Sequence, residues 1–115
     1  GEACGYHFVF ADRGGETVGY ACHGPIPATL QSHDLYWIVV RKSEQGRGLG
    51  SRLLAAAEAR IHARGGHRVY VETSSRLDYA ATRGFYRGQG YELKAELEDF
   101  YAPGDGKQIW LKVLT

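Results

Sequence analysis

The sequence has little that would place the chain in a membrane or direct it to secretion. No apolar run approaches the roughly 18 residues that a membrane-spanning helix needs. The first residues lack the basic stretch and the long apolar segment of a secretory signal peptide. We therefore expect a protein with no membrane partner that resides in the cytoplasm.

Charge of one sign is also scarce. The formal net charge is only +1, and the Lys and Arg residues are scattered among acidic ones. A protein that binds nucleic acid needs an excess of positive charge on one side to neutralise phosphates. The charge balance therefore argues against a nucleic-acid partner.

Metal-binding and redox motifs are missing as well. The two cysteines, Cys4 and Cys22, form no C-x-x-C pair. This pattern favours two reduced thiols in a cytoplasmic protein, and a disulfide between them stays open. The histidines lack ligand spacing such as H-x-x-x-H, so we predict no metal site; they are His7, His23, His33, His62 and His67.

The composition is that of one small folded domain. The chain has 115 residues, of which 43% are hydrophobic and 12% aromatic. We predict a single domain over residues 1–115. Apolar periodicity and chain breakers predict mixed α/β structure in the order β-β-β-α-β-α-β-β, antiparallel at both ends and parallel in the middle. The predicted strands are 6–11, 16–22, 34–41, 67–73, 91–96 and 107–114, and the predicted helices are 49–64 and 79–87.

Several single residues carry further structural predictions. Residues 24–32 are predicted to form a loop, because a proline has no N–H to donate to a central strand. Both faces of the strand at 34–41 are apolar, which is typical of a strand covered on both sides. Gly19 marks a bulge or a close approach of other atoms. Asp78 is the expected N-cap of the second helix, and Gly84 within that helix is expected to pack closely against a neighbour.

A glycine-rich loop, Gln45–Gly50, stands between an apolar strand and an amphipathic helix. The first amides of a helix have no partner within the helix, and the helix dipole makes them attractive to an anion. A P-loop would require a lysine directly after Gly50, and a dinucleotide fingerprint would place its third glycine one position later. The loop therefore belongs to neither of these two classes.

The pattern Gln-x-x-Gly-x-Gly in this loop resembles the acetyl-CoA pyrophosphate loop of the GCN5-related N-acetyltransferases, the GNAT family. A second motif, Phe85–Tyr91, resembles the Tyr-containing element at the end of the family's last helix, and one strand separates the two motifs. The resemblance covers nearly the whole chain from Tyr6 onward and is nearest to a bacterial subgroup of unassigned substrate. It implies a mixed sheet whose central strands splay around an acyl-CoA.

The resemblance also assigns roles to residues that bind acetyl-CoA. Strand backbone is expected to pair with the pantetheine arm, and loop amides are expected to hold the pyrophosphate. For Arg47 and Arg52, a solvated charge and a phosphate contact both stay open. The expected binding residues are Ile38, Val39, Val40, Gln45, Gly46, Arg47, Gly48, Leu49, Gly50 and Ser51.

The implied reaction is direct attack of an acceptor amine on the acetyl thioester in a ternary complex. The amine must lose a proton before attack, and a thiolate must leave. The family usually directs a tyrosine hydroxyl to the leaving sulfur, and this role falls on Tyr86. Glu72 is the first candidate for the general base, with Asp34 and Asp99 as alternatives; each could instead be ion-paired or solvated. We thus predict an N-acetyltransferase for a small-molecule amine, with residues 25–32 and 99–105 shaping the acceptor pocket.

Two departures from the family pattern keep alternatives open. Tyr79 stands where many relatives carry an Asn that contacts the cofactor. The chain begins at what would be the family's second strand, which leaves the edge of the first hairpin unprotected and favours a homodimer. A non-catalytic acyl-CoA-binding module, a fragment of a larger protein, and an unrelated nucleotide-binding α/β domain are the alternative interpretations.

Overall fold

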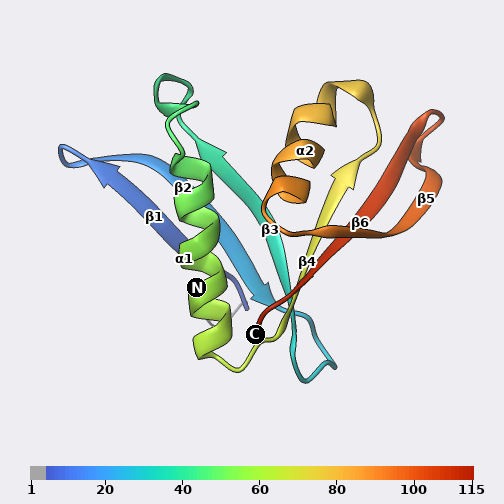
Figure 1. Cartoon of the computed structure of the whole chain (residues 1–115), viewed down its shortest axis with the longest axis horizontal. Helices are drawn as coiled ribbons and strands as arrows, with labels where there is room; N and C mark the ends of the chain where they lie inside the picture. The colour runs from blue at the N-terminus through green and yellow to red at the C-terminus, as the bar shows by residue number, and fades with distance from the viewer. Residues whose placement is uncertain (1–4) are drawn as a thin grey trace. The chain divides into compact units, whose positions relative to one another are not determined.

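The structure is a computed structural model, and it describes residues 5–115 (Figure 1). The six strands belong to one sheet with the order β1-β2-β3-β4-β6-β5. The predicted order of strands and helices is confirmed, with short 3-10 turns (η) added. The elements are β1 (His7–Arg13), β2 (Glu16–Pro25), β3 (Ser32–Val40), η2 (Lys42–Glu44), α1 (Leu49–Ala63), β4 (Arg68–Ser74), η3 (Leu77–Tyr79), α2 (Ala80–Gly88), β5 (Glu92–Ala102) and β6 (Asp105–Val113).

The chain divides into two compact units. The first unit runs to Val69 and includes Leu114–Thr115, and the second unit is Tyr70–Val113. The single domain over residues 1–115 therefore stays a prediction. Within residues 5–115, no helix has both the length and the apolar character to span a membrane. Cys4, for which the sequence left a reduced thiol and a disulfide with Cys22 open, lies outside the described residues.

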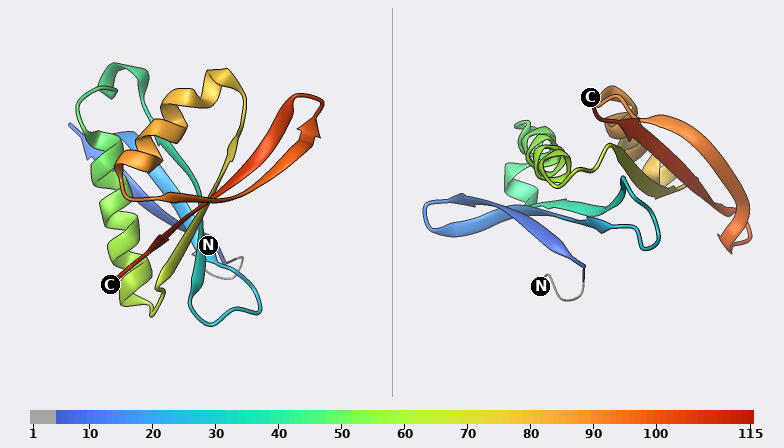
Figure 2. Two further views of the ribbon diagram at one scale, coloured as in Figure 1. Left: turned by 45° about the vertical axis from the view of Figure 1, so that its right-hand side comes forward. Right: turned by 90° about the horizontal axis from the view of Figure 1, so that it is seen from below.

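The core of the first unit forms between α1 and one face of β1, β2 and β3 (Figure 2). A Cβ added to Gly19 would lie 3.1 Å from Leu53 Cδ1 and 3.0 Å from the Val39 carbonyl oxygen. The predicted close approach at Gly19 is thereby confirmed. The buried aliphatic residues of the first unit include Val9, Val18, Ala21, Leu35, Leu53, Leu54, Ala57 and Ile61. Burial of each Val, Leu or Ile side chain contributes about 1.5–3 kcal/mol, and burial of each alanine methyl group about 0.8 kcal/mol.

The opposite face of β3 is open, which corrects the prediction of a strand covered on both sides. Trp37 and Val39 are 44% and 43% exposed. Cross-strand pairing places Val39 on the same face as Tyr20 and Phe10. The reason is that α1, the helix of this unit, packs on the other face. The apolar pattern of β3 indicated that both faces could be buried, but not what would cover them.

Strand β2 continues to Pro25 and is therefore longer than predicted. The strand can include this proline because the missing N–H is not needed for a hydrogen bond to β3. Pro25 pairs with His33 in the antiparallel register with β3. The N–H of Ile26 donates to the Ser32 carbonyl at 2.9 Å. Since backbone groups alternate in direction along a strand, the nitrogen of Pro25 faces away from β3. The predicted loop at 24–32 therefore starts two residues later.

Strand β5 is also longer than predicted, and it contains a wide bulge. The register runs from Leu97 opposite Lys107 to Ala102 opposite Asp105, so residues 98–101 oppose Gly106 alone. Asp99 lies in the bulge with a φ of 56°, and its Oδ1 accepts a hydrogen bond from the Gly104 N–H at 2.8 Å. The sequence predicted a turn from residue 99, because residues 99–106 are rich in Asp, Pro and Gly. In the structure, residues 98–101 form a bulge instead, and the strand resumes at Ala102.

The second unit packs its core around Trp110. Trp110 is 1% exposed, and its Nε1–H donates to Thr73 Oγ1 at 2.9 Å. Tyr91 and Tyr86 are buried beside each other, with ring centroids 5.5 Å apart and nearly perpendicular planes. Val71 and Thr73 of β4 and Leu111 of β6 are also buried.

The ends of the two helices agree only in part with the sequence. Gly65 follows α1 with a φ of 84°, as predicted for a left-handed cap. Asp78 does not cap α2, because the N-cap is the next residue, Tyr79; Asp78 lies in η3 and pairs with Arg76 at 3.3 Å. A Cβ at Gly84 would meet nothing within 4 Å, so the predicted close packing there is wrong.

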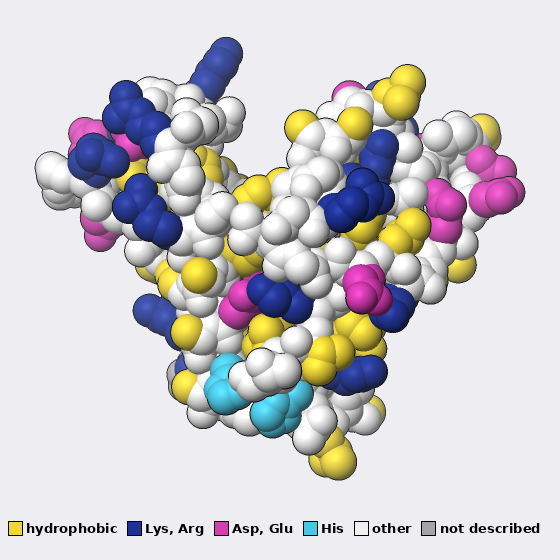
Figure 3. All heavy atoms as spheres, in the orientation of Figure 1, with side chains coloured by type: hydrophobic (Ala, Val, Ile, Leu, Met, Phe, Trp, Pro, Cys, Tyr) yellow, Lys and Arg dark blue, Asp and Glu magenta, His cyan; other side chains and the backbone are white. Residues whose placement is uncertain are grey.

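A buried histidine distinguishes the first unit. His23 is 0% exposed, its ring stacks on His7 with centroids 5.4 Å apart, and neither ring nitrogen has a hydrogen-bond partner among the described residues. Burial, reinforced by the nearby positive side chains, lowers the pKa of His23 from 6.5 to about 4. Those side chains are His7 on β1, His33 on β3, and Arg60 and Arg64 at the end of α1. Other histidine side chains gather at the surface of this unit (Figure 3).

His23 is expected to make the free energy of unfolding fall as the pH drops from about 6.5 to 4. The pKa is lower in the folded than in the unfolded chain, so protons bind preferentially to the unfolded state over this range. The expected loss is about 3 kcal/mol at pH 4 relative to neutral pH. Urea unfolding at a series of pH values measures it, and His23→Phe, which keeps a stacked ring, should remove this part of the pH dependence. His62→Gln, at an exposed histidine, is the control; an unchanged pH dependence in His23→Phe would contradict the assignment.

Candidate functional site

The glycine-rich loop leads from the end of β3 into α1. Gly46 and Gly48 have φ values of 80° and 78°, in the left-handed region that favours glycine. Gly48 is the N-cap of α1, where no side chain makes a capping hydrogen bond, and the first turn of the helix contains no acidic residue. The positive end of the helix is therefore not neutralised by an acid of its own first turn, and an anion could bind there.

Side chains hold the loop in place from several directions. The Gln45 amide donates from Nε2 to the Val40 carbonyl at 3.1 Å. Glu44 is almost buried and pairs with Arg13 at 3.0 Å, and Arg41 pairs with Glu16 at 2.9 Å. Two ion pairs thus join the segment before the glycines to the β1–β2 hairpin. The sequence reasoning missed them, because the partners are far apart in the chain.

The predicted strand residues of the site lie in β3, beside β2. The antiparallel register pairs Ile38 with Ala21, Val39 with Tyr20, and Val40 with Gly19. Arg47 of the loop and Arg52 of α1 are exposed, and no described contact chooses between a solvated charge and a phosphate contact for either. The predicted binding residues all lie in the first unit, within residues 38–51, and their role in binding stays a prediction.

Tyr86, the predicted proton donor, lies in α2 of the second unit. It is 6% exposed, and its ring packs edge-on against Phe85 and Tyr91 at centroid distances of 5.2 and 5.5 Å. Burial raises the pKa of the Tyr86 hydroxyl from 10 to about 12. The hydroxyl is therefore protonated throughout the neutral range and can act as a hydrogen-bond donor.

The candidates for the general base are engaged to different degrees. Glu72 in β4 pairs through Oε1 with the Lys107 ammonium at 2.9 Å, and Lys107 also lies over the ring of Phe100, 4.6 Å from its centroid. Asp99 is used by the bulge of β5. Asp34 is half-buried in β3 of the first unit. Among the described residues, no cluster of three or more His, Cys, Asp or Glu is arranged to hold a metal ion.

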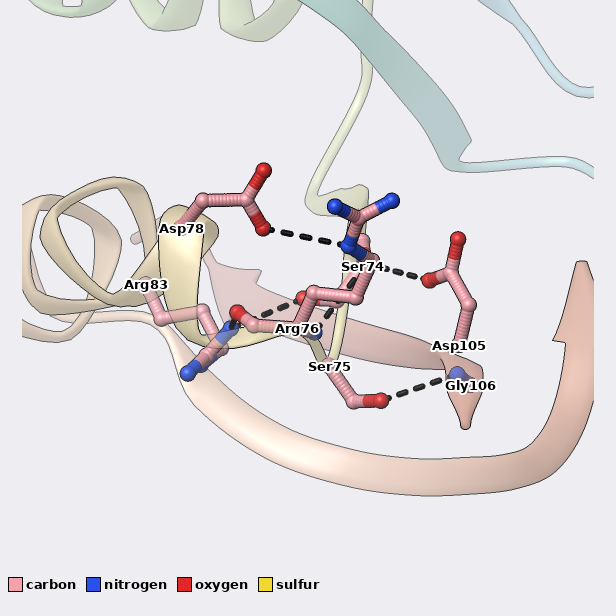
Figure 4. Close-up of polar contacts among 7 residues, drawn as sticks. All are labelled: Ser74, Ser75, Arg76, Asp78, Arg83, Asp105 and Gly106. Atoms are coloured by element: carbon pink, nitrogen blue, oxygen red, sulfur yellow. Dashed lines mark hydrogen bonds and ion pairs between the residues drawn. The ribbon is translucent and has the colours of Figure 1, made fainter. Parts of the chain in front are cut away.

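A polar network that the sequence did not indicate follows the end of β4 (Figure 4). The Ser74 hydroxyl bonds to Asp105 Oδ1 and accepts the Arg76 N–H at 3.1 Å. The Ser75 hydroxyl accepts the Gly106 N–H at 2.8 Å, and the Ser75 N–H donates to the Gly106 carbonyl at 2.9 Å. The segment after β4 is thus fixed to the beginning of β6. Arg83 reaches the same segment from α2.

Known proteins resemble this chain both in sequence and in fold. The model of the acetyltransferase (GNAT) family matches residues 1–91. Blasticidin-S acetyltransferase from Streptomyces morookaense is 39% identical over 106 residues, which are 83% of this chain and 73% of that protein. The L-methionine sulfoximine/L-methionine sulfone acetyltransferase of Pseudomonas aeruginosa is 33% identical over 95 residues, and the match spans 77% of this chain but only 52% of that protein.

Two solved structures show the likeness of the fold. A GNAT-family protein from Desulfovibrio desulfuricans superimposes with a TM-score of 0.96 at 45% identity, covering 98% of this chain and 72% of that one. An aminoglycoside 6'-N-acetyltransferase complexed with coenzyme A has a TM-score of 0.85 at 20% identity, covering 96% of this chain and 74% of that one. The latter similarity is one of fold alone.

The glycine at the start of α1 can be tested by the same substitution at two positions. A Cβ would meet nothing within 4 Å at either Gly48 or Gly84, but only Gly48 has a positive φ. Gly48→Ala is expected to lower the free energy of unfolding by about 1–2 kcal/mol through backbone strain. Gly84→Ala is expected to raise it by about 0.5–1 kcal/mol, because alanine is the better residue inside a helix. Denaturant unfolding measures both; equal effects of the two variants would contradict the left-handed conformation at Gly48.

Proposed function

Because the chain belongs to the acetyltransferase (GNAT) family, we propose that it transfers an acetyl group from acetyl-CoA to an amine of a small-molecule acceptor. Family membership confirms the resemblance drawn from the two sequence motifs. The observation that carries the proposal is the start of α1, where two left-handed glycines precede a helix with no side-chain cap and no acidic first turn.

The donor is acetyl-CoA, and the loop fits its pyrophosphate chemically. Backbone amides from Gln45 to Ser51 would hold the phosphates, because glycines leave no side chain to keep them at a distance. The backbone of Ile38 and Val40 would pair with the pantetheine amides, and Val39 lies between them in the same part of the site. A relative in fold was solved with coenzyme A bound, which supports this choice of donor.

In the proposed reaction, the acceptor nitrogen attacks the thioester carbon and the carbon–sulfur bond breaks. The amine loses its proton to a general base, and the leaving thiolate is stabilised by the Tyr86 hydroxyl. Since the pKa of Tyr86 is raised to about 12 and that of an ordinary thiol is about 8.5, a hydrogen bond to the sulfur is favoured over complete proton transfer. Glu72 remains the first candidate for the base, with Asp34 and Asp99 as alternatives.

We propose a small-molecule amine as the acceptor, because the names of three similar proteins refer to blasticidin S, L-methionine sulfoximine and aminoglycosides. Blasticidin-S acetyltransferase carries the most weight, since the match spans 73% of its length, against 52% for an N-alpha-acetyltransferase RimI that is also 39% identical. We further propose a cytoplasmic homodimer, in which the outermost strand β1 pairs with a strand of the second copy.

A second candidate function, an acyl-CoA-binding module without turnover, is favoured by the engagement of Glu72 and Asp99 in other contacts.

The experiment follows thiol release from acetyl-CoA in the presence of blasticidin S, L-methionine sulfoximine and an aminoglycoside. Tyr86→Phe keeps the ring in its aromatic cluster and removes only the hydroxyl. We expect kcat to fall about 100-fold, because the donor to the sulfur is lost, while the KM for acetyl-CoA changes less than about twofold.

Tyr91→Phe, in the same cluster, is the matched control and should retain the parent kcat. If the parent chain binds acetyl-CoA but accelerates thiol release with none of these amines, the module without turnover is the better account. If Tyr86→Phe turns over like the parent, Tyr86 is not the donor.

A further inference from the structure

Helix α2 lacks the features that stabilise a helix by itself. It has nine residues, no side-chain hydrogen bond at its N-cap, and no acidic residue in its first turn. Gly84 lies at its centre with open space where a Cβ would be. Short helices with such sequences are marginal in water, so contacts with the rest of the second unit must determine where α2 lies.

Arg83 provides the contact at the first turns of α2. Its Nη1 donates to the carbonyl of Ser74 at 2.9 Å and to the carbonyl of Arg76 at 2.7 Å (Figure 4). Both carbonyls belong to the segment that Asp105 and Gly106 fix from β6. One guanidinium therefore ties the helix to a backbone segment that is itself held on a second side.

Arg87 provides an independent contact one turn later. Its guanidinium lies 5.1 Å from the centroid of the Trp110 ring, and Trp110 is bonded to Thr73 of β4. Residues three and four apart lie on the same side of a helix. Tyr86, three residues after Arg83, therefore lies on the side of α2 that the two arginines anchor.

We propose that Arg83 is a positioning residue for acetyl transfer, which holds α2 on the carbonyls of Ser74 and Arg76 and thereby sets the place from which the Tyr86 hydroxyl acts. Arg83 acts only through Tyr86 and touches no substrate. The inference rests on the proposed role of Tyr86. Because Arg87 still anchors the helix, loss of Arg83 displaces α2 without unfolding it.

Steady-state kinetics of Arg83→Gln, Arg83→Lys and Arg76→Gln test the proposal on the full chain. The rate is thiol release from acetyl-CoA with the fastest amine of the panel above, or with water as the acceptor if no amine accelerates it. We expect Arg83→Gln to lower kcat about 10-fold to 100-fold, as for a misplaced catalytic group, with the KM for acetyl-CoA within about twofold. Arg83→Lys should recover part of the rate, because an ammonium can donate to both carbonyls as Nη1 does, but it stands on a shorter and more flexible stem.

Arg76→Gln is the matched control. It removes a guanidinium from the same segment, but the Arg76 side chain is exposed and its ion pair is with Asp78, which is exposed as well, so kcat should equal that of the parent. Circular dichroism and thermal unfolding of each variant establish that the fold is retained. A kcat equal to the parent's in folded Arg83→Gln would overturn the proposal.

A double-mutant cycle separates positioning from a general structural role. In the Tyr86→Phe background, Arg83→Gln should cause no further fall in kcat, because the group that it positions is already gone. An equal fall in both backgrounds would overturn the proposal. If Tyr86→Phe alone leaves kcat intact, the proposed role of Tyr86 is wrong, and the proposal that Arg83 positions it is overturned as well. Any fall in the kcat of Arg83→Gln in the parent background would then come from a contribution that does not pass through Tyr86.

Discussion

The proposed binding of acetyl-CoA depends on how the backbone enters α1. Gly48 adopts a left-handed conformation, and the helix begins without a side-chain cap. With glycine at the N-cap, the missing side-chain cap costs the helix only about a few tenths of a kcal/mol, and burial of Leu53, Leu54 and Ile61 on the sheet more than offsets this cost. The ion pair between Arg13 and Glu44 holds the preceding segment on the first hairpin. The fold thus stabilises a helix end that no acid of its first turn neutralises.

The two motifs that identify the family lie in different compact units. The glycine loop belongs to the first unit, and Tyr86 belongs to the second. The first relies on backbone amides and on glycines that leave a phosphate room to approach them. The second relies on one hydroxyl, whose place is set by the packing of Phe85 and Tyr91 and, as we propose, by Arg83. Substitutions in the first unit should therefore change binding, and those in the second should change the rate.

Local patterns predicted the order of the elements, the glycine loop and the glycine cap at Gly65, because each depends on neighbouring residues alone. Properties that depend on distant residues were not predictable. The exposure of Trp37 is determined by what covers β3, and the bulge before Ala102 by pairing with β6. The contacts of Arg83 join a helix to a segment seven to nine residues earlier. The sequence contains this arginine, but nothing in its spacing indicates two carbonyl acceptors.

The most direct test of the central claim is calorimetric titration of the chain with acetyl-CoA, compared with Gly48→Glu and Gly65→Glu. Both glycines have positive φ and open space at the Cβ, but they stand at opposite ends of α1. We expect micromolar binding by the parent and by Gly65→Glu, and none by Gly48→Glu, because a carboxylate at the start of the helix would repel the pyrophosphate. Absence of binding by the parent, or equal binding by folded Gly48→Glu, would contradict the account.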